Sequence, residues 1–315
     1  MEIDFNSEVL ILDGGLATEL ERRGQDISGP LWSARVLLDA PEAIEQLHYD
    51  YFAAGAQCVT SASYQASYEG FATLGLTAAE TTLLLQRSVA LAQNARKRWE
   101  ADNRMRSGVR ETASGRKRYV AASVGPYGAT LHDGSEYHGN YGLSVGGLTE
   151  FHAARFEILS ESGADLLACE TIPSLDEARA LLDLLRDRQN TQAWLSFTSP
   201  DGIHTSHGEG LTECARAADG VESVIAVGVN CVHPRVVVTA VREVSRGTNK
   251  PVVVYPNSGE QWDARSGQWR GRPDGSSLAD LSPAWVVAGA RLIGGCCRTG
   301  PADIAGLAQA LIGRA

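Results

Sequence analysis

Two adjacent cysteines stand near the C-terminal end of the chain, in the segment RLIGGCCRTGP at residues 291–301. A disulfide between neighbours is unfavourable, because a trans peptide bond holds their Cα atoms closer together than the bridge requires. Cys296 and Cys297 are therefore predicted to carry free thiols, which either pack as small apolar groups or bind a metal ion. A third cysteine, Cys231, ends the apolar segment VIAVGVNC at 224–231.

Three thiolates can bind a zinc ion and leave its fourth tetrahedral position open, an arrangement typical of catalytic rather than structural zinc sites. Sulfur ligands also favour Zn²⁺ over Mg²⁺ or Ca²⁺. Because three thiolates neutralise the charge of the metal, such a site is poorly suited to activating water. It suits a substrate thiol instead, whose pKa of about 8.5 falls on coordination. The three cysteines therefore predict alkyl transfer to a thiol.

Eight short apolar segments recur along the chain and alternate with segments of helical periodicity. The apolar segments are residues 8–15, 56–63, 119–126, 164–172, 192–199, 224–231, 251–258 and 290–297, and helical ones include 41–55, 78–100, 174–188, 234–245 and 301–312. Apolar strands alternating with helices indicate a parallel sheet covered on its outer face, and eight such units predict a single (β/α)8 TIM barrel domain over residues 1–315. A doubly wound open sheet is the alternative, but LDGGLATEL at 12–20 does not fit the G-x-G-x-x-G fingerprint.

Polar residues stand at the ends of six predicted strands: Asp13-Gly14-Gly15, Thr60-Ser61, Glu170-Thr171, Asn230-Cys231, Asn257-Ser258 and Cys296-Cys297. In a barrel the C-terminal strand ends meet at one mouth, where the active sites of this fold lie. The three cysteines are therefore expected to converge there. The long connections 127–147 and 259–280 are predicted to form pocket walls, and the basic segment 97–118 a solvated loop.

The composition narrows the class of partners. The chain has 28 basic and 38 acidic residues and a net charge of −10, which argues against nucleic acid as a partner. Neither a signal peptide nor an apolar window of about twenty residues is evident, so no membrane association is expected. Six cysteines in such a chain predict reduced thiols and a cytoplasmic location. Those outside the trio, Cys58, Cys169 and Cys214, are predicted to be small buried apolar residues.

Several segments together resemble the homocysteine S-methyltransferase family. GVNC at 228–231 and GGCCRTGPADI at 294–304 are similar to its zinc signature, and the likeness extends through LDGGLATEL (12–20), SYQAS (63–67), SVGPYGA (123–129), DLLACET (165–171) and VVYPNSGE (253–260). This resemblance covers essentially the whole chain. It implies transfer of a methyl group from a sulfonium donor, S-methylmethionine or S-adenosylmethionine, to L-homocysteine, giving methionine. It also implies a Zn²⁺ ion bound by Cys231, Cys296 and Cys297, with the sulfur of homocysteine as the fourth ligand.

The resemblance further implies how the amino-acid end of homocysteine is bound. Asp13 and Glu170 would accept hydrogen bonds from its ammonium group, and backbone N–H groups around Gly14 and Gly15 would hold its carboxylate. Charge-assisted hydrogen bonds of this kind are strong, which agrees with two carboxylates at strand ends. The alternative role for Asp13 is to cap the helix that follows.

The sulfonium donor carries a positive charge, which aromatic faces stabilise. The aromatic residues expected at the mouth are Trp32, Tyr64, Tyr127 and Tyr255, each of which is otherwise a pocket-wall or core residue. Ser61 and Asn230 are expected to form hydrogen bonds with polar groups of the substrates, or else with the backbone at strand ends.

Three other functions are compatible with the sequence. One is a betaine-dependent homocysteine methyltransferase, although that branch has an aromatic residue where this chain has Thr171. Another is a zinc or redox sensor that binds metal through its vicinal thiols without turnover. The third is an unrelated barrel enzyme with incidental cysteines, which would bind no stoichiometric zinc.

Overall fold

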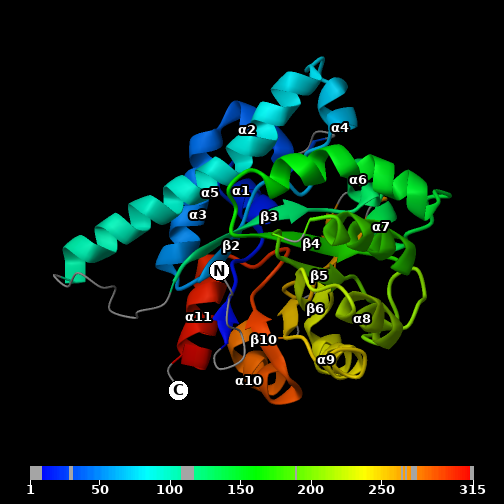
Figure 1. Cartoon of the computed structure of the whole chain (residues 1–315). Coiled ribbons are helices and arrows are strands. Elements are labelled where there is room, and N and C mark those ends of the chain that lie inside the picture. The colour runs from blue at the N-terminus through cyan, green and yellow to red at the C-terminus, as the bar shows by residue number, and fades with distance from the viewer. Residues whose placement is uncertain are drawn as a thin grey trace.

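An eight-stranded parallel sheet lies at the centre of the computed structural model, and helices surround it (Figure 1). The structure describes residues 9–27, 31–107, 117–188, 190–263, 265–266, 268–270 and 275–312. The strands of the sheet are β1 (Leu10–Ile11), β2 (Cys58–Thr60), β3 (Tyr119–Val124), β4 (Leu166–Ile172), β5 (Ala193–Phe197), β6 (Val224–Asn230), β7 (Val252–Tyr255) and β10 (Ala290–Ile293). Each of them lies inside one of the eight segments predicted from the sequence.

The sheet closes into a barrel. Its strand order is β1-β10-β7-β6-β5-β4-β3-β2, and all neighbouring strands are parallel. A parallel bridge between Leu12 and Cys58 joins the ends of the outer strands β1 and β2. The predicted (β/α)8 barrel is therefore confirmed, because an open doubly wound sheet would leave two free edges.

The helices follow the strands along the chain. They are α1 (Leu16–Arg22), α2 (Ser33–Asp39), α3 (Pro41–Ala53), α4 (Tyr68–Ala72), α5 (Ala78–Ser107), α6 (Val145–Ser160), α7 (Leu175–Arg186), α8 (Leu211–Asp219), α9 (Val237–Ser245), α10 (Leu278–Ala288) and α11 (Pro301–Ile312), with 3-10 helices η1 (Tyr127–Thr130), η2 (Ser135–Tyr137) and η3 (Pro234–Val236). Proline at the first position of α3 and α11 suits a helix start, where no N–H is needed. The hydroxyls of Ser174 and Ser277 accept hydrogen bonds from N–H groups in the first turns of α7 and α10.

Both faces of the sheet are buried. Leu10 and Leu12 belong to the cluster inside the barrel, to which all eight strands contribute, whereas Ile11 packs in the cluster between the sheet and the helices. Successive side chains of a strand point to opposite faces, so both faces need apolar residues. This burial explains why the strands are continuous apolar segments in the sequence.

The predicted loop at 97–118 is helical in its first part, because α5 continues to Ser107. Trp99 packs against Phe52 of α3, with ring centroids 6.5 Å apart, and this contact continues the buried face of α5 into the polar stretch. Residues 108–116 lie outside the described part of the chain.

The other two predicted loops also contain regular structure. Residues 127–147 include η1, η2 and the start of α6, and residues 259–280 include the start of α10 and the antiparallel pair β8 (Gln261–Asp263) and β9 (Gln268–Arg270). Residues 264, 267 and 271–274 are outside the described part. Among the helices that the structure describes, none is both long enough and apolar enough for a membrane crossing.

Candidate metal and substrate site

A cavity of about 110 Å³ lies at the mouth of the barrel. It is lined by residues 13–18, Trp32, Ser33, residues 60–62, Tyr64, Glu136, Tyr137, Glu170, Thr171, Cys231, Tyr255 and residues 295–297. Most of these lie at the C-terminal ends of β1, β2, β4, β6, β7 and β10, as expected for this fold. Of the predicted site residues, only Asn230 and Tyr127 do not line the cavity.

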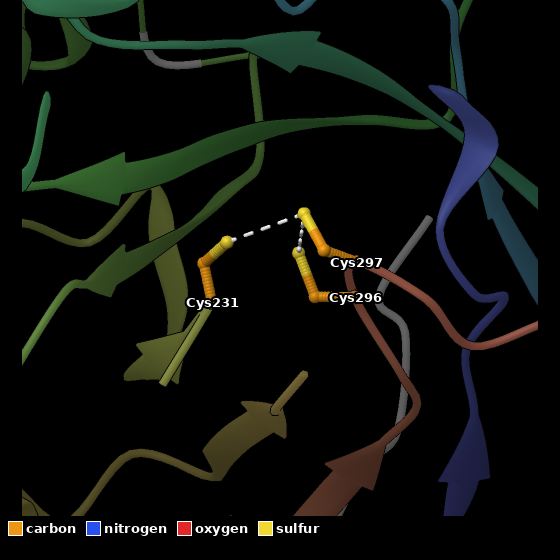
Figure 2. Close-up of side chains that lie close together, drawn as sticks. All are labelled: Cys231, Cys296 and Cys297. Atoms are coloured by element: carbon orange, nitrogen blue, oxygen red, sulfur yellow. Dashed lines mark hydrogen bonds between the residues drawn. The ribbon is translucent and has the colours of Figure 1, made fainter. Parts of the chain in front are cut away.

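Three thiols point toward one another from the ends of two strands (Figure 2). Cys231 follows β6, and Cys296 and Cys297 follow β10. The Sγ atoms of Cys231 and Cys297 are 3.6 Å apart, those of Cys296 and Cys297 are 4.0 Å apart, and all three lie within 4.8 Å of one another. Zinc–sulfur bonds of about 2.3 Å at tetrahedral angles place two sulfur ligands about 3.8 Å apart. The three thiols therefore fit a metal ion with three sulfur ligands.

The backbone next to the thiols adopts a conformation that residues with side chains rarely take. Cys231 has a φ of 54°, and Arg298, directly after Cys297, has a φ of 66°. The N–H of Cys296 donates to the carbonyl oxygen of Pro256 at 2.8 Å, which ties the cysteine segment to the end of β7. Non-glycine residues at positive φ concentrate at functional sites, since the surrounding structure must hold them there.

Gly294 and Gly295 precede the cysteine pair because their positions leave no room for a side chain. A Cβ atom at Gly294 would lie 2.6 Å from Cβ of Leu12, and one at Gly295 would lie 2.2 Å from Oγ1 of Thr299. Neither glycine has a positive φ. Close packing against the end of β1 and against the turn at Thr299 is therefore what requires glycine here.

The three thiols differ in their tendency to ionise. Hydrogen bonds from Cys296 and Cys297 hold the pKa of the Cys231 thiol well below its usual range. The same contacts with Cys231 raise the pKa of Cys296 and of Cys297 well above their usual range. Cys231 is thus the most readily ionised of the three thiols, which suits a cluster that binds a cation.

Glu136 and Tyr137 line the cavity but were not predicted as site residues. The hydroxyl of Tyr137 lies 3.3 Å from Sγ of Cys231. Both residues belong to η2, within the segment 127–147 that was predicted as a pocket wall. The sequence signal was limited to the glycine and aromatic content of that segment, which does not say which side chains face the cavity.

Two buried carboxyl groups, those of Asp13 and Glu170, also line the cavity. Asp13 accepts hydrogen bonds from the backbone N–H and the hydroxyl of Thr60, both at 2.8 Å, and Glu170 accepts one from the hydroxyl of Ser123. Burial raises the pKa of each carboxyl group to about 7. None of the described residues that line the cavity is Lys, Arg or His, so a positively charged ligand would find no competing protein cation there.

Asn230 holds the backbone next to Glu170 and does not face the cavity. Its Oδ1 accepts hydrogen bonds from the N–H of Thr171 at 2.7 Å and from the hydroxyl of Ser196 at 2.8 Å, and its Nδ2 donates to Oγ1 of Thr171 at 2.8 Å. Thr171 has a φ of 62°. These contacts are the strand-end alternative that the sequence left open for Asn230. The amide holds the strained backbone of Thr171, inside β4 and directly after Glu170.

Gly14 and Gly15 let the end of β1 approach the segment that carries the cysteines. A Cβ atom at Gly14 would lie 2.5 Å from the carbonyl oxygen of Thr299, and one at Gly15 would lie 2.5 Å from that of Cys296. The N–H of Gly15 donates to the carbonyl oxygen of Thr299 at 2.9 Å, so it is already occupied, contrary to the expectation that it holds a substrate carboxylate. The N-cap residue of α1 is Gly15, which removes the alternative that Asp13 caps this helix.

The predicted aromatic residues divide into two groups. Trp32, Tyr64 and Tyr255 line the cavity. The ring of Tyr127 instead makes edge contacts with Tyr141 and Phe151, with centroids 5.1 Å and 4.9 Å apart. The structure therefore places Tyr127 in an aromatic cluster outside the cavity lining, which is the alternative that the sequence left open for it.

Ser61 lines the cavity, but its hydrogen bonds are made within the protein. Its hydroxyl lies 2.8 Å from that of Ser63 and accepts from the N–H of Ser123 at 3.1 Å. Because Ser123 also donates to Glu170, these serines link the ends of β2, β3 and β4. This is the strand-end alternative that the sequence left open for Ser61.

The cysteines outside the trio have no access to the cavity. Cys58, Cys169 and Cys214 are free and buried, as expected for small apolar residues. His48 is buried in α3, and neither of its ring nitrogens has a hydrogen-bond partner among the described residues. Among the described residues, the trio is the one group of His, Cys, Asp and Glu side chains with the spacing of a metal site.

Comparison with known proteins shows which family of enzymes the whole chain is similar to. A profile of the homocysteine S-methyltransferase family matches residues 10–311. The chain is 46% identical over 298 residues to homocysteine S-methyltransferase YbgG of Bacillus subtilis, covering 94% of this chain and 92% of that protein. It is 47% identical over 301 residues to a homocysteine S-methyltransferase of Escherichia coli, covering 95% and 94%. The solved structure of the metallated homocysteine methyltransferase MmuM from Escherichia coli matches with a TM-score of 0.84 and 44% identity, over 96% of both chains.

Proposed function

The chain belongs to the homocysteine S-methyltransferase family, and we propose that it takes the methyl group from a sulfonium donor, S-methylmethionine or S-adenosylmethionine. Its activity as a homocysteine S-methyltransferase follows from the family. The proposal adds the donor, methionine as the product, and a Zn²⁺ ion bound by Cys231, Cys296 and Cys297. It also treats residues 1–315 as one homocysteine-binding domain.

The observation that carries this proposal is that one cavity contains both the three thiols and the two buried carboxyl groups of Asp13 and Glu170. Homocysteine has a thiol at one end and an ammonium group at the other. A metal at the trio suits the thiol, and the carboxylates suit the ammonium group, which meets no competing protein cation among the described lining residues.

When bound, the zinc ion would lower the pKa of the homocysteine thiol, so that its sulfur can react as a thiolate near neutral pH. Asp13 and Glu170 would accept hydrogen bonds from the ammonium group. Thr60 and Ser123 donate to these carboxylates and would keep their oxygens directed into the cavity. A substrate bound at both ends presents its sulfur in one direction, which is the condition for in-line attack on a methyl carbon.

The carboxylate of homocysteine needs its own partner. Because the N–H of Gly15 is bonded to Thr299, we assign this role to the N–H of Gly14, which lines the same wall of the cavity. The faces of Trp32 and Tyr64, which also line the cavity, would stabilise the positive charge of the donor.

The reaction needs no general acid or base from the protein. The thiol proton of homocysteine goes to solvent, and the electron pair of its sulfur forms the new bond to the methyl carbon. The bond between that carbon and the donor sulfur breaks, with its electron pair going to the donor sulfur. The donor therefore leaves as a neutral thioether, which requires no proton. With S-methylmethionine, both products are methionine.

The test is a zinc assay combined with a measurement of methionine formation. The purified protein should contain about one zinc ion per chain and should form methionine from homocysteine with S-methylmethionine or S-adenosylmethionine. Turnover with betaine alone would favour the betaine-using branch. Bound zinc without turnover would favour a thiol sensor, and a protein without stoichiometric zinc would refute the metal assignment. The three thiols must be reduced for metal binding, which fits the proposed cytoplasmic location.

A further inference from the structure

The cavity contains a third carboxyl group, that of Glu136, which the roles assigned above do not use. Glu136 lies in η2, in the connection between β3 and α6, and lines the cavity. Its Oε2 atom is buried and has no hydrogen-bond partner among the residues that the structure describes. Leaving a carboxylate oxygen buried with neither a hydrogen bond nor a counter-charge is costly, so such a group in a ligand cavity indicates a ligand that supplies one of the two.

Glu136 stands on the thiol side of the cavity. The next residue, Tyr137, has its hydroxyl 3.3 Å from Sγ of Cys231. The pKa of Glu136 is raised to about 7, mainly because the carboxyl group is buried, and repulsion from Cys231 adds to this effect. Repulsion from Cys231 also raises the pKa of Glu170, and the carboxyl group of Glu170 in turn raises that of Asp13. Besides the carboxyl groups of Asp13 and Glu170, assigned above to the ammonium group of homocysteine, the cavity thus has that of Glu136, next in the chain to the tyrosine that contacts Cys231.

Methyl transfer requires the donor sulfur to lie near the same thiols. In an in-line displacement the methyl carbon sits between the two sulfur atoms, so the donor sulfur is within a few ångströms of the homocysteine sulfur. The positive charge of the donor sulfur therefore enters a partly desolvated region, where a nearby carboxylate stabilises it more strongly than in water.

We propose that Glu136 is the counter-charge of the sulfonium group and determines the preference of the donor site for a cation over a neutral ligand of the same shape. This inference rests on the sulfonium donor of the proposed function. It assigns to Glu136 the recognition of charge, whereas the aromatic residues contribute a surface that also accepts neutral groups.

The fold of this connection does not depend on the free oxygen of Glu136. The N–H of Tyr137 donates to the carbonyl oxygen of Gly134 at 2.9 Å, and the N–H of Gly139 donates to that of Ser135 at 2.9 Å. Replacement of Glu136 by Gln keeps the shape of the side chain and breaks no hydrogen bond of Oε2. The variant is therefore expected to fold and to bind zinc and homocysteine like the unchanged protein.

The experiment compares two ligands of the zinc-loaded protein by calorimetry. S-methylmethionine carries the sulfonium charge, and 2-amino-5-methylhexanoate has a CH group in place of that sulfur and no charge there. The unchanged protein should bind S-methylmethionine on the order of ten- to a hundredfold more tightly than the neutral analogue. Glu136→Gln should reduce this ratio about tenfold, mainly by weakening the binding of S-methylmethionine, and Trp32 and Tyr64 should account for the preference that remains. Glu150→Gln, at an exposed position of α6, is the control for loss of one negative charge.

Two results would overturn the inference. If Glu136→Gln weakened both ligands equally, the carboxylate would bind a group common to both, such as their ammonium group. If the ratio stayed unchanged, Glu136 would have no role in donor recognition. The proposed function has its own test. It fails if the unchanged protein forms no methionine from any sulfonium donor, and this result does not depend on the binding ratio measured for Glu136→Gln.

Discussion

Affinity for the amino-acid end of homocysteine should fall as the pH is lowered through 7. The carboxyl groups of Asp13 and Glu170 each have a pKa of about 7, raised from 3.8 and 4.5 mainly by burial. Only the ionised form can accept hydrogen bonds from an ammonium group. A group with a pKa of 7 is about 90% ionised at pH 8 and about 10% ionised at pH 6. The dissociation constant should therefore rise about tenfold over this range if one ionised carboxylate is needed, and up to about a hundredfold if both are.

Norvaline isolates this effect, because it has a methyl group in place of the thiol of homocysteine and so adds no thiol ionisation of its own. Its dissociation constant, measured by calorimetry between pH 6 and pH 8, should decrease with rising pH and level off above 7. Glu170→Gln removes one titrating group, and it should weaken norvaline binding at pH 8 and flatten the profile. Equal affinity at pH 6 and pH 8 would refute the assignment of these carboxylates to the ammonium group.

Three further predictions concern the metal, the packing and the stability. Cys297→Ala should lose bound zinc and activity while its circular dichroism and melting temperature stay close to those of the metal-free parent, and zinc retained at one equivalent would contradict the ligand assignment. Gly15→Ala places a Cβ atom 2.5 Å from the carbonyl oxygen of Cys296, so it should lower zinc affinity and melting temperature, whereas Gly146→Ala, with no atom closer than 3.8 Å, should not. Burial lowers the pKa of His48 from 6.5 to about 4, so protons bind the unfolded chain first and stability is lost as the pH falls from above 6.5 toward 4. This loss should be about 2 kcal/mol at pH 5 relative to neutral pH, and His48→Leu should remove that part of the slope in urea unfolding.

Much of the barrel could be predicted from the sequence because the burial of its strands is a local property of the chain. Each strand lies between the barrel interior and a layer of helices, so its residues are apolar on both faces and form a recognisable segment. The polar residues that end these segments, among them Asp13, Glu170 and Cys231, could then be assigned to one mouth by the rule for this fold.

The details of the site were less predictable at strand ends and in loops. Asn230 and Cys231 are neighbours, yet the side chain of Asn230 supports Thr171 while that of Cys231 lines the cavity. A shift of one residue in the register of the strand would exchange the directions of these two side chains, and the sequence alone does not determine that register. Glu136 and Tyr137 lie in a connection whose path depends on distant contacts.

One such contact joins the N–H of Tyr127 to Oε1 of Glu177 at 2.6 Å, across 50 residues of sequence. His152 also lies 2.9 Å from that oxygen, so the start of the connection is held against α6 and α7. No local pattern encodes such a contact, because its partners become neighbours only when the barrel closes.

The sequence by itself determined the kind of chemistry available, since three cysteines and two carboxyl-bearing strand ends are chemical facts of the chain. It also determined the barrel, because secondary structure and burial follow from local patterns of apolar residues. Only the tertiary structure decided which groups are free to meet a ligand. The N–H of Gly15 is occupied by Thr299, 284 positions later in the chain, and the Oε2 atom of Glu136 has no hydrogen-bond partner in the described part of the chain. Whether a polar group already has a hydrogen-bond partner depends on neighbours that folding brings together. The residue types of the site could therefore be predicted from the sequence, but which of their polar groups remain available to a ligand could not.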